Sequence, residues 1–420
     1  MQTLPSLGSS VLGAAKALPM IMLFLFACSE EEIVQPDIEV SSITSPSSFK
    51  VLNPALNTSA MEIALDYVEQ IGVDFSLAEA DIARLQSAVD TLINLPTQDN
   101  LDLAKQVWLS AHGSYELTAL HRYFASQVFN EQQGLELMQL QYQINHWPIV
   151  PGYIDYVDGY IDSGIVNDIN VRLDSIALRE QHGVFDVSEV TLGFHVIEFL
   201  LWGNNTYSNA RPVDDYLAIE QLNQDLAQSG YTLDQLGNNR RRQLLTLVTS
   251  SLLEDFRSLH SLWLTQLPET RLFIEDIAGP EVIIILADSM AAMLTEELLL
   301  RSMYPMLNGN FVESVQSPFS LSTQIAVSTQ LSGLERLLLE RQTENGTTLD
   351  LIFSAISNEF SEFFYQNFDA SKSCLVLLYR NLDSATTTPL NQGQIEIVEC
   401  INLLTNMVSH IERLKFELSN

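Results

Sequence analysis

A histidine and a glutamate lie three residues apart inside an otherwise apolar stretch of this sequence. The stretch runs from Gly193 to Gly203, and its two ionisable residues are His195 and Glu198. An imidazole or a carboxylate that is buried without a partner costs on the order of several kcal/mol. We therefore expect the pair to meet each other, a partner side chain or a cation, and this choice decides what the site does.

The spacing predicts that the pair lies on a helix over residues 189–202, which begins after Ser188 as N-cap and ends at Gly203. At about 100° per residue, His195 and Glu198 share one face of that helix, and apolar side chains cover the rest. A helix that is apolar on all sides is a buried one. The pair is therefore expected to be shielded from water.

Two further pairs of ionisable residues have helical spacing. His112 and Glu116 are four residues apart, with Tyr115 beside them. Glu297 precedes Arg301 by four residues, which is the favourable order for an ion pair on a helix. Such pairs are usually local salt bridges worth a few tenths of a kcal/mol. A local salt bridge is thus the alternative to a role of these residues in a binding site.

Several known metal and catalytic motifs are missing from the sequence. None of the seven histidines belongs to an HExxH motif, and none has a glutamate three residues before it, as a di-iron helical bundle requires. A nucleophile elbow, a P-loop and a dinucleotide-binding glycine motif are also absent. His195 and Glu198 supply fewer ligands than the roughly four to six that zinc or iron takes. Any metal site must therefore borrow carboxylates or waters from other helices.

The N-terminal residues have the pattern of a secretory signal. A lysine precedes the apolar run at 18–26, which is followed by Ala27, Cys28 and an acidic segment. A run of this length is too short to span a bilayer, which needs about 20 residues. A small residue directly before a cysteine is typical of a bacterial lipobox, so we predict a lipoprotein signal peptide at 1–27 and a lipid anchor at Cys28. A plain signal peptide is the alternative.

The segment after the cysteine predicts where the protein resides. The serine that follows Cys28 favours the outer membrane of a Gram-negative cell, with the protein facing the periplasm. Residues 28–54 are rich in Ser, Pro, Glu and Asp and have little periodicity, which predicts a flexible tether. The expected membrane contact is thus made through the lipid alone.

Composition restricts the partners and the redox setting. The chain has 53 acidic and 20 basic residues and a net charge of −33. Nucleic acids and anionic lipid surfaces need the opposite sign, so we expect no nucleic-acid partner, whereas cations are natural ligands of such a field. The alternative is that the acidity only keeps the protein soluble in a salty habitat. Cys374 and Cys400 remain after lipidation, and in an oxidising envelope they can pair across antiparallel helices.

The body of the chain has a helical pattern almost throughout, without alternating strand patterns between turn signals. An all-α protein built of helical bundles follows. Its length indicates two domains, which we place at 55–237 and 238–420. The predicted helices outside the central motif cover residues 79–95, 101–129, 239–267, 281–307, 322–341, 349–368 and 392–418. Pro268 is expected to end the third of them.

The central stretch resembles the GxHxxE motif of the imelysin family, with Gly193, His195 and Glu198 at its fixed positions. The residues that follow it, up to Gly203, also look like that family. Further similarities occur in the expected order at Tyr115-Glu116, Trp147-Pro148, Ile154-Asp155, Glu297 with Arg301, and Ser317 to Ser320. Together they cover about residues 105–320.

The resemblance implies an all-helical fold of two helical-bundle domains with a cleft between them. It also implies a bacterial envelope protein linked to iron-regulated uptake. The family was first described as metallopeptidases, a function that the missing HExxH motif supports poorly. It is also similar to the periplasmic component of a ferrous-iron transporter, in which the HxxE pair is thought to bind metal.

Three hypotheses follow. The first is an envelope lipoprotein that binds iron or another divalent metal ion without catalysis and works with an iron-transport system. His195, Glu198 and Glu116 are its ligands, and the residues expected around them are His112, Tyr115, Glu297, Arg301, Ser317 and Ser320. The second is a metallopeptidase in which a metal at His195 and Glu198 activates water and another carboxylate is the general base. In the third, His195 and Glu198 only satisfy one another and stabilise the bundle.

Overall fold

The computed structural model describes residues 53–419, apart from 205–210, 358–359 and 384–389. These residues belong to one compact unit, 47–420. The described part is helical and contains no β-strand beyond two isolated bridges in loops. The predicted all-α class is therefore confirmed. The predicted signal peptide at 1–27, the anchor at Cys28 and the tether up to residue 52 lie outside the described residues.

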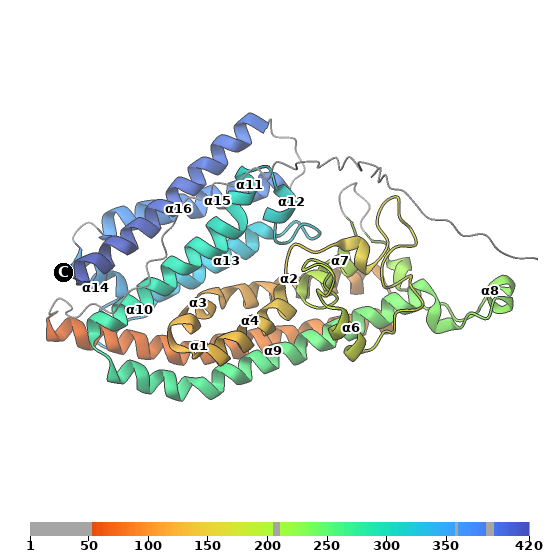
Figure 1. Ribbon diagram of the computed structural model, residues 1–420, viewed down its shortest axis with the longest axis horizontal. Helices are drawn as coiled ribbons and strands as arrows, with labels where there is room; N and C mark the ends of the chain where they lie inside the picture. Colours follow the sequence, from red (N-terminus) through yellow and green to blue (C-terminus); the bar gives the residue numbers. More distant parts are fainter. Residues whose placement is uncertain (1–52, 205–210, 358–359, 384–389, 420) are drawn as a thin grey trace, which may run out of the picture. The chain divides into compact units, whose positions relative to one another are not determined.

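The first half of the chain combines long helices with a loop-rich segment (Figure 1). The long helices are α1 (Pro54–Asn94), α2 (Gln98–Leu117), α3 (Ala119–Val128) and α4 (Glu131–Asn145). The shorter elements are α5 (Pro151–Ile154), α6 (Ser175–Gln181), α7 (Phe194–Trp202), η2 (Val213–Tyr216), α8 (Gln224–Gln228) and η3 (Leu233–Gln235).

The second half consists mainly of long helices. It begins with α9 (Gly237–Asp276), α10 (Gly279–Ala292), the π-helical segment η4 (Met293–Met303), α11 (Tyr304–Leu307) and α12 (Phe311–Ser314). It continues with α13 (Thr323–Glu335), the π-helical segment η5 (Arg336–Glu340), α14 (Leu349–Ile356), α15 (Phe360–Asp383) and α16 (Leu390–Ser419).

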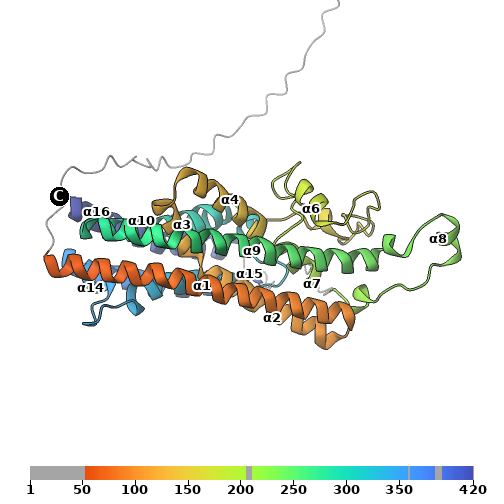
Figure 2. The same cartoon turned by 90° about the horizontal axis from the view of Figure 1, so that it is seen from below.

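Helix α1 organises the core, because α2, α9 and α10 all pack against it. Figure 2 shows α9 running alongside α1 over much of its length. Helix α13 packs against both α2 and α15, and α16 packs against α15, α10 and η4. The buried apolar residues form one cluster that extends from Ala60 to Leu418. Helices from both sides of residue 237 thus share this cluster, and a domain boundary there stays a prediction.

The expectation that Pro268 ends a helix is wrong, because α9 continues through it to Asp276. A proline inside a helix costs about 3 kcal/mol. The side chains of Trp263 and Ile274, on either side of the proline, are fully buried. Burying two side chains of this size offsets a cost of that order. Tertiary packing therefore overrides the local signal.

Cys374 and Cys400 form a disulfide between α15 and α16, with their Cα atoms 5.6 Å apart. The sequence allows this pairing without requiring it, and the structure contains it. In the described part of the chain, no helix combines the length and the apolar character needed to cross a membrane.

Candidate functional site

Helix α7 carries the central motif and begins at Phe194, so the predicted start at residue 189 with Ser188 as cap is wrong. Gly193 is the N-cap residue, with φ = 99°. A Cβ atom at this position would lie 2.7 Å from the backbone oxygens of Gln143 and Ile144 in α4. The motif therefore needs glycine here for two reasons, the positive φ and the close approach of α4.

The His195 and Glu198 side chains meet each other inside the protein. Nδ1 of His195 lies 2.8 Å from Oε2 of Glu198. Both side chains are buried, with 1% and 0% of their surface exposed. The helix is apolar on all sides, as predicted, and eight of its nine residues are buried.

The second oxygen of Glu198 is held by the segment that precedes α13. Oε1 accepts hydrogen bonds from the backbone N–H of Phe319 (3.1 Å), the backbone N–H of Ser320 (2.7 Å) and the Ser320 hydroxyl (2.7 Å). The predicted proximity of Ser320 to the pair is therefore present in the structure. Ser317 lies nearby in the chain, and its backbone N–H donates to Oγ1 of Thr323 at 3.0 Å.

Burial changes the ionisation of both members of the pair. It raises the pKa of Glu198 to about 7, although the hydrogen bonds from Ser320 act in the opposite direction. It lowers the pKa of His195 well below its ordinary value, and the nearby His112 acts in the same direction. The imidazole is therefore neutral at neutral pH. When its Nδ1 donates to Glu198, its Nε2 keeps a lone pair.

Nε2 of His195 is buried and has no hydrogen-bond partner among the described residues. Aromatic rings surround the imidazole. The rings of His195 and His112 lie 5.2 Å apart, and the His112 ring stacks on Trp108 at 4.8 Å. The Trp108 indole N–H donates to the backbone oxygen of Phe194 at 2.9 Å, which attaches α2 to the start of α7.

Glu116 lies in α2, and amide side chains from three other segments occupy its oxygens. Oε1 accepts from Asn145 at 2.7 Å and from Gln316 at 2.6 Å, and Oε2 accepts from Gln330 at 2.7 Å. The predicted pair with His112 is present at 3.4 Å. Burial raises the pKa of Glu116, but the His112 hydrogen bond and the Arg122 charge outweigh burial and hold it well below its usual range. The carboxylate is thus ionised.

The predicted pair of Glu297 and Arg301 is also present, on the π-helical segment η4. Their closest nitrogen and oxygen atoms are 3.5 Å apart. Glu297 also accepts a hydrogen bond from the Tyr123 hydroxyl at 2.9 Å and lies 3.6 Å from Nη2 of Arg122. Arg301 stacks over the Trp147 ring, with its guanidinium carbon 4.3 Å from the ring centre. Segments of π-helix occur frequently at functional sites.

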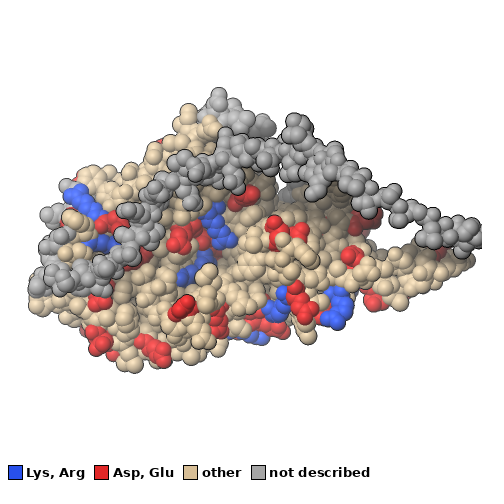
Figure 3. Space-filling model, viewed as in Figure 1, with Lys and Arg blue, Asp and Glu red and all other residues tan. Residues whose placement is uncertain are grey.

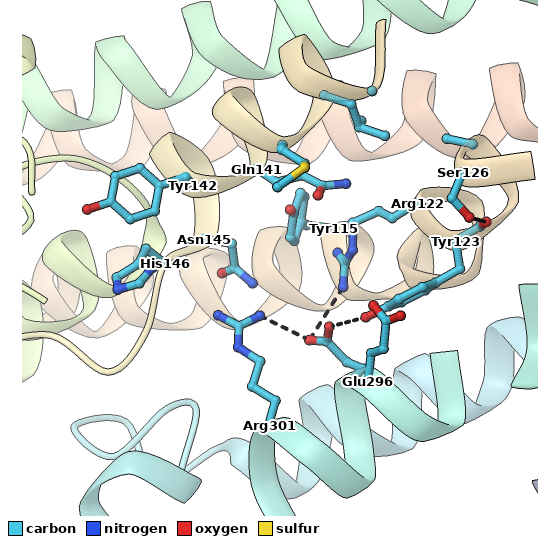
Figure 4. A pocket seen from close by; sticks show the side chains of 15 residues that line it. Tyr115, Arg122, Tyr123, Ser126, Gln141, Tyr142, Asn145, His146, Glu296 and Arg301 are labelled. Atoms are coloured by element: carbon cyan, nitrogen blue, oxygen red, sulfur yellow. Dashed lines mark hydrogen bonds and ion pairs between the residues drawn. The ribbon is translucent and has the colours of Figure 1, made fainter. Parts of the chain in front are cut away.

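A pocket of about 520 Å³ lies beside these residues (Figure 4). Its wall includes Tyr115, Arg122, His146, Glu297 and Arg301. His146 is the C-cap residue of α4. Burial, together with the nearby charge of Arg301, lowers the pKa of His146 to about 4. This imidazole is therefore neutral under physiological conditions.

The acidic residue of the Ile154-Asp155 motif forms buried ion pairs with two arginines. Asp155 is fully buried and accepts from Arg241 at 2.5 Å, and its second partner is Arg211 at 2.8 Å. These contacts connect the loop after α5 with α9 and with the segment after α7. A buried carboxylate with two guanidinium partners stabilises this junction only as a complete set.

The residues present fit a metal ion in part. The unpartnered Nε2 of His195 is suited to one ligand position, and the hydrogen bond between Nδ1 and Glu198 fixes the orientation of the ring. The oxygens of Glu116 and Glu198 are engaged by other donors. Within the described residues, no group of three or more His, Cys, Asp or Glu side chains is placed to hold a metal ion. The ligand set of His195, Glu198 and Glu116 therefore stays a prediction.

The surface view in Figure 3 shows acidic and basic side chains in small mixed groups on one face, with uncharged residues between them. The predicted attraction of cations rests on the charge of the whole chain, −33. It stays a prediction.

The fold and the central motif define a class of all-helical proteins with a buried His-Glu pair at the start of a short helix. The family model described as Imelysin matches residues 75–394. The chain therefore belongs to the imelysin family. No curated protein matches its sequence.

A solved structure has a similar fold. It is that of a candidate iron-regulated protein A precursor from Parabacteroides distasonis, which is 12% identical in sequence. The similarity covers 88% of this chain and 98% of that chain, with a TM-score of 0.59. At this level of identity the comparison shows a shared fold.

Proposed function

We propose that this protein is an iron-handling lipoprotein of the bacterial cell envelope, which binds iron or another divalent metal ion and takes part in its uptake. Membership of the imelysin family supports the proposal. The structural relative from Parabacteroides distasonis is named for iron regulation, which points in the same direction. The observation that carries the proposal is the buried, unpartnered Nε2 of His195, backed by the Glu198 carboxylate.

This arrangement matches a general feature of histidine ligands. A histidine that binds a metal usually donates its other ring N–H to a carboxylate, which fixes the tautomer and raises the basicity of the ligand nitrogen. His195 and Glu198 have this relation, with Nδ1 and Oε2 2.8 Å apart. In this proposal Nε2 is the primary ligand and Glu198 fixes its orientation.

The ion is cargo here, so the protein need not supply every ligand. Iron accepts imidazole nitrogen, carboxylate oxygen and water together. Glu116 is ionised and belongs to the same buried region, but it must exchange an amide partner, such as Asn145 or Gln316, to become a ligand. The remaining positions are left to water or to groups that the ion brings with it.

The test is thermal unfolding of the mature protein under anaerobic conditions, with and without ferrous ion. A ligand that binds only the folded state stabilises it by about 2.7 kcal/mol at a hundredfold excess over Kd. We expect ferrous ion to raise the melting temperature of the wild type and not that of His195→Ala.

His121→Ala is a matched control. His121 is also buried and also contacts a carboxylate, with Nε2 3.1 Å from Asp74, but its Nδ1 is bonded to the Tyr67 hydroxyl at 2.8 Å. This variant should lose stability and keep the response to the metal. An equal rise in melting temperature for the wild type and His195→Ala would contradict the proposal.

A further inference from the structure

The pocket beside η4 contains buried nitrogen atoms that bond to no described residue. Nη1 of Arg122, Nε2 of Gln141 and Nε2 of His146 are buried nitrogen atoms without a hydrogen-bond partner in the part of the chain that the structure describes. All three residues line the pocket. Figure 4 shows that Arg122 and Gln141 are directed into the same open space. Three unused nitrogens around one cavity point to a ligand.

Arg122 is the strongest of these groups. Its side chain is only 9% exposed, so water compensates little for the unused N–H groups on Nη1. Its Nη2 faces Glu116 at 3.7 Å and Glu297 at 3.6 Å. The guanidinium is thus charged and fixed on one side, while its other side is left for a further acceptor.

Two carboxylates beside the pocket, those of Glu297 and Glu116, are already in use. The oxygens of Glu297 face Tyr123, Arg122 and Arg301, and those of Glu116 accept from three amide side chains. The unmet requirement is therefore for acceptor oxygens. A carboxylate satisfies it best, because a guanidinium binds a carboxylate through charge-assisted, often bidentate hydrogen bonds.

The charges and the walls narrow the class of ligand further. Arg122 and Arg301 face Glu116 and Glu297, and Glu296 also lines the pocket, so these groups leave no counter-charge for a ligand with two negative charges. The remaining wall is largely apolar and aromatic. It includes Tyr115, Ala125, Leu137, Met138 and Tyr142. A volume of about 520 Å³ is in the range of small-molecule sites.

We infer that this pocket binds a small organic monocarboxylate. Its oxygens accept hydrogen bonds from Nη1 of Arg122 and Nε2 of Gln141, and its apolar body packs against Leu137, Met138 and Tyr142. The inference goes beyond the proposed metal binding at His195 and does not depend on it. The ligand is recognised by an acceptor group and an apolar body, and no metal ion is required.

The test uses the mature protein after metal removal on a chelating resin, in a chloride buffer, because soluble carboxylate chelators would compete. Benzoate and its neutral analogue benzamide are titrated by ligand-observed NMR, with inorganic phosphate as a second anion. We expect saturable binding of benzoate, at least about tenfold weaker binding of benzamide because the charge-assisted bonds are lost, and no competition by phosphate. Equal affinity for benzoate and benzamide, displacement of benzoate by phosphate, or no binding of benzoate would overturn the inference.

Variants locate the site. Arg122→Lys keeps the charge that balances Glu116 and Glu297 but removes the planar fork, and Gln141→Met removes a donor at similar volume. Each should weaken benzoate binding by about tenfold. Gln139→Met is the matched control, because Gln139 lies on α4 with Gln141 but is exposed and outside the pocket. Unchanged affinity in both pocket variants would overturn the inference.

A third variant does not touch the charged residues. Gly134 lines the pocket from α4, and a Cβ atom at this position would meet no atom within 4 Å. Gly134→Leu should therefore fill part of the pocket, keep the helix intact and reduce benzoate binding at least tenfold. Since these measurements contain no metal, their failure leaves the proposed function standing, and loss of the metal response at His195 leaves this inference standing.

Discussion

Nδ1 of His195 lies 2.8 Å from Oε2 of Glu198, and the other oxygen of Glu198 accepts three hydrogen bonds from Phe319 and Ser320. The pair is therefore a chain of contacts from α7 to the segment before α13. It leaves one buried nitrogen, Nε2 of His195, without a partner among the described residues. The predictions below test what each member of this chain contributes.

Glu198→Gln should abolish the metal response at a small cost in stability. The glutamine oxygen can replace Oε1 toward Phe319 and Ser320, and its NH₂ group then faces Nδ1 of His195. Nδ1 must accept, so the proton moves to Nε2 and the ligand lone pair is lost. We expect a loss of about 1 kcal/mol in unfolding free energy without metal. Nitrogen-15 NMR of the His195 ring identifies the tautomer. If the Glu198→Gln variant kept the wild-type tautomer and the metal response, the proposed role of Glu198 would be contradicted.

The two buried groups should give opposite pH dependences of stability. Burial raises the pKa of Glu198 from 4.5 to about 7, so the folded state holds a proton that the unfolded state releases, and stability falls as pH rises through this window. Burial lowers the pKa of His195 well below 6.5, so the unfolded state takes up the proton and stability falls as pH decreases below 6.5.

These effects partly cancel in the wild type, and single variants separate them. Urea unfolding between pH 4.5 and 7.5 should show a steeper loss toward high pH in His195→Ala, and a steeper loss toward low pH in Glu198→Gln. Parallel curves for all three proteins would show that neither group changes its pKa on folding.

Gly193→Ala should destabilise the protein by about 2–4 kcal/mol, because it combines positive-φ strain with overpacking against α4. Gly230→Ala separates the two effects, since Gly230 has φ = 79° but a Cβ there meets nothing within 4 Å. The unfolding free energy of this control variant should fall by only about 1–2 kcal/mol. Urea unfolding measures both, and equal losses would mean that the contact with Gln143 and Ile144 is relieved without cost.

The mature protein loaded with zinc or iron should not cleave unfolded protein substrates faster than Glu198→Gln does. Both oxygens of Glu198 are engaged, so neither is available to activate a water. Fluorescent casein degradation provides the measurement. Chelator-sensitive cleavage by the wild type that disappears in the variant would favour the peptidase hypothesis over metal binding.

Cys28→Ser should block lipidation and leave an unprocessed or misprocessed precursor, because in a lipobox the cysteine sulfur is the atom to which the lipid is attached. Labelling of growing cells with a palmitate analogue should mark the wild type only. Equal labelling of both proteins would exclude an anchor at this residue.

Much of the fold could be predicted from the sequence, because the periodicity of apolar residues is local. It gave the all-α class, the continuous helical run of α10, η4 and α11, and the buried helix that carries His195 and Glu198. Local signals do not locate the start of α7, since Ser188 is a good N-cap residue by type, whereas the need for glycine at position 193 comes from α4. Likewise, local rules predict that Pro268 ends a helix, whereas packing against α1 keeps α9 continuous through this residue.

The partners of the candidate site were harder to predict. Gln316 and Gln330 donate to Glu116 from about two hundred positions further along the chain, and isolated glutamines carry no periodic signal. Arg122 and Tyr123 join Glu297 in the same way. A surplus of carboxylates in an acidic chain indicates that the buried ones must find donors, but it does not name them.

The disulfide between Cys374 and Cys400 changes how the C-terminal helix can be lost. It closes α15 and α16 into a covalent ring that spans 26 positions. A protease that cuts the connection between the two helices would leave both fragments joined. The C-terminal piece, which supplies the buried Leu404, Met407 and Ile411, would stay seated against α10 and η4. In an environment rich in proteases, the fold would therefore tolerate a single cleavage here. Release of the C-terminal helix would require both cleavage and reduction of the disulfide.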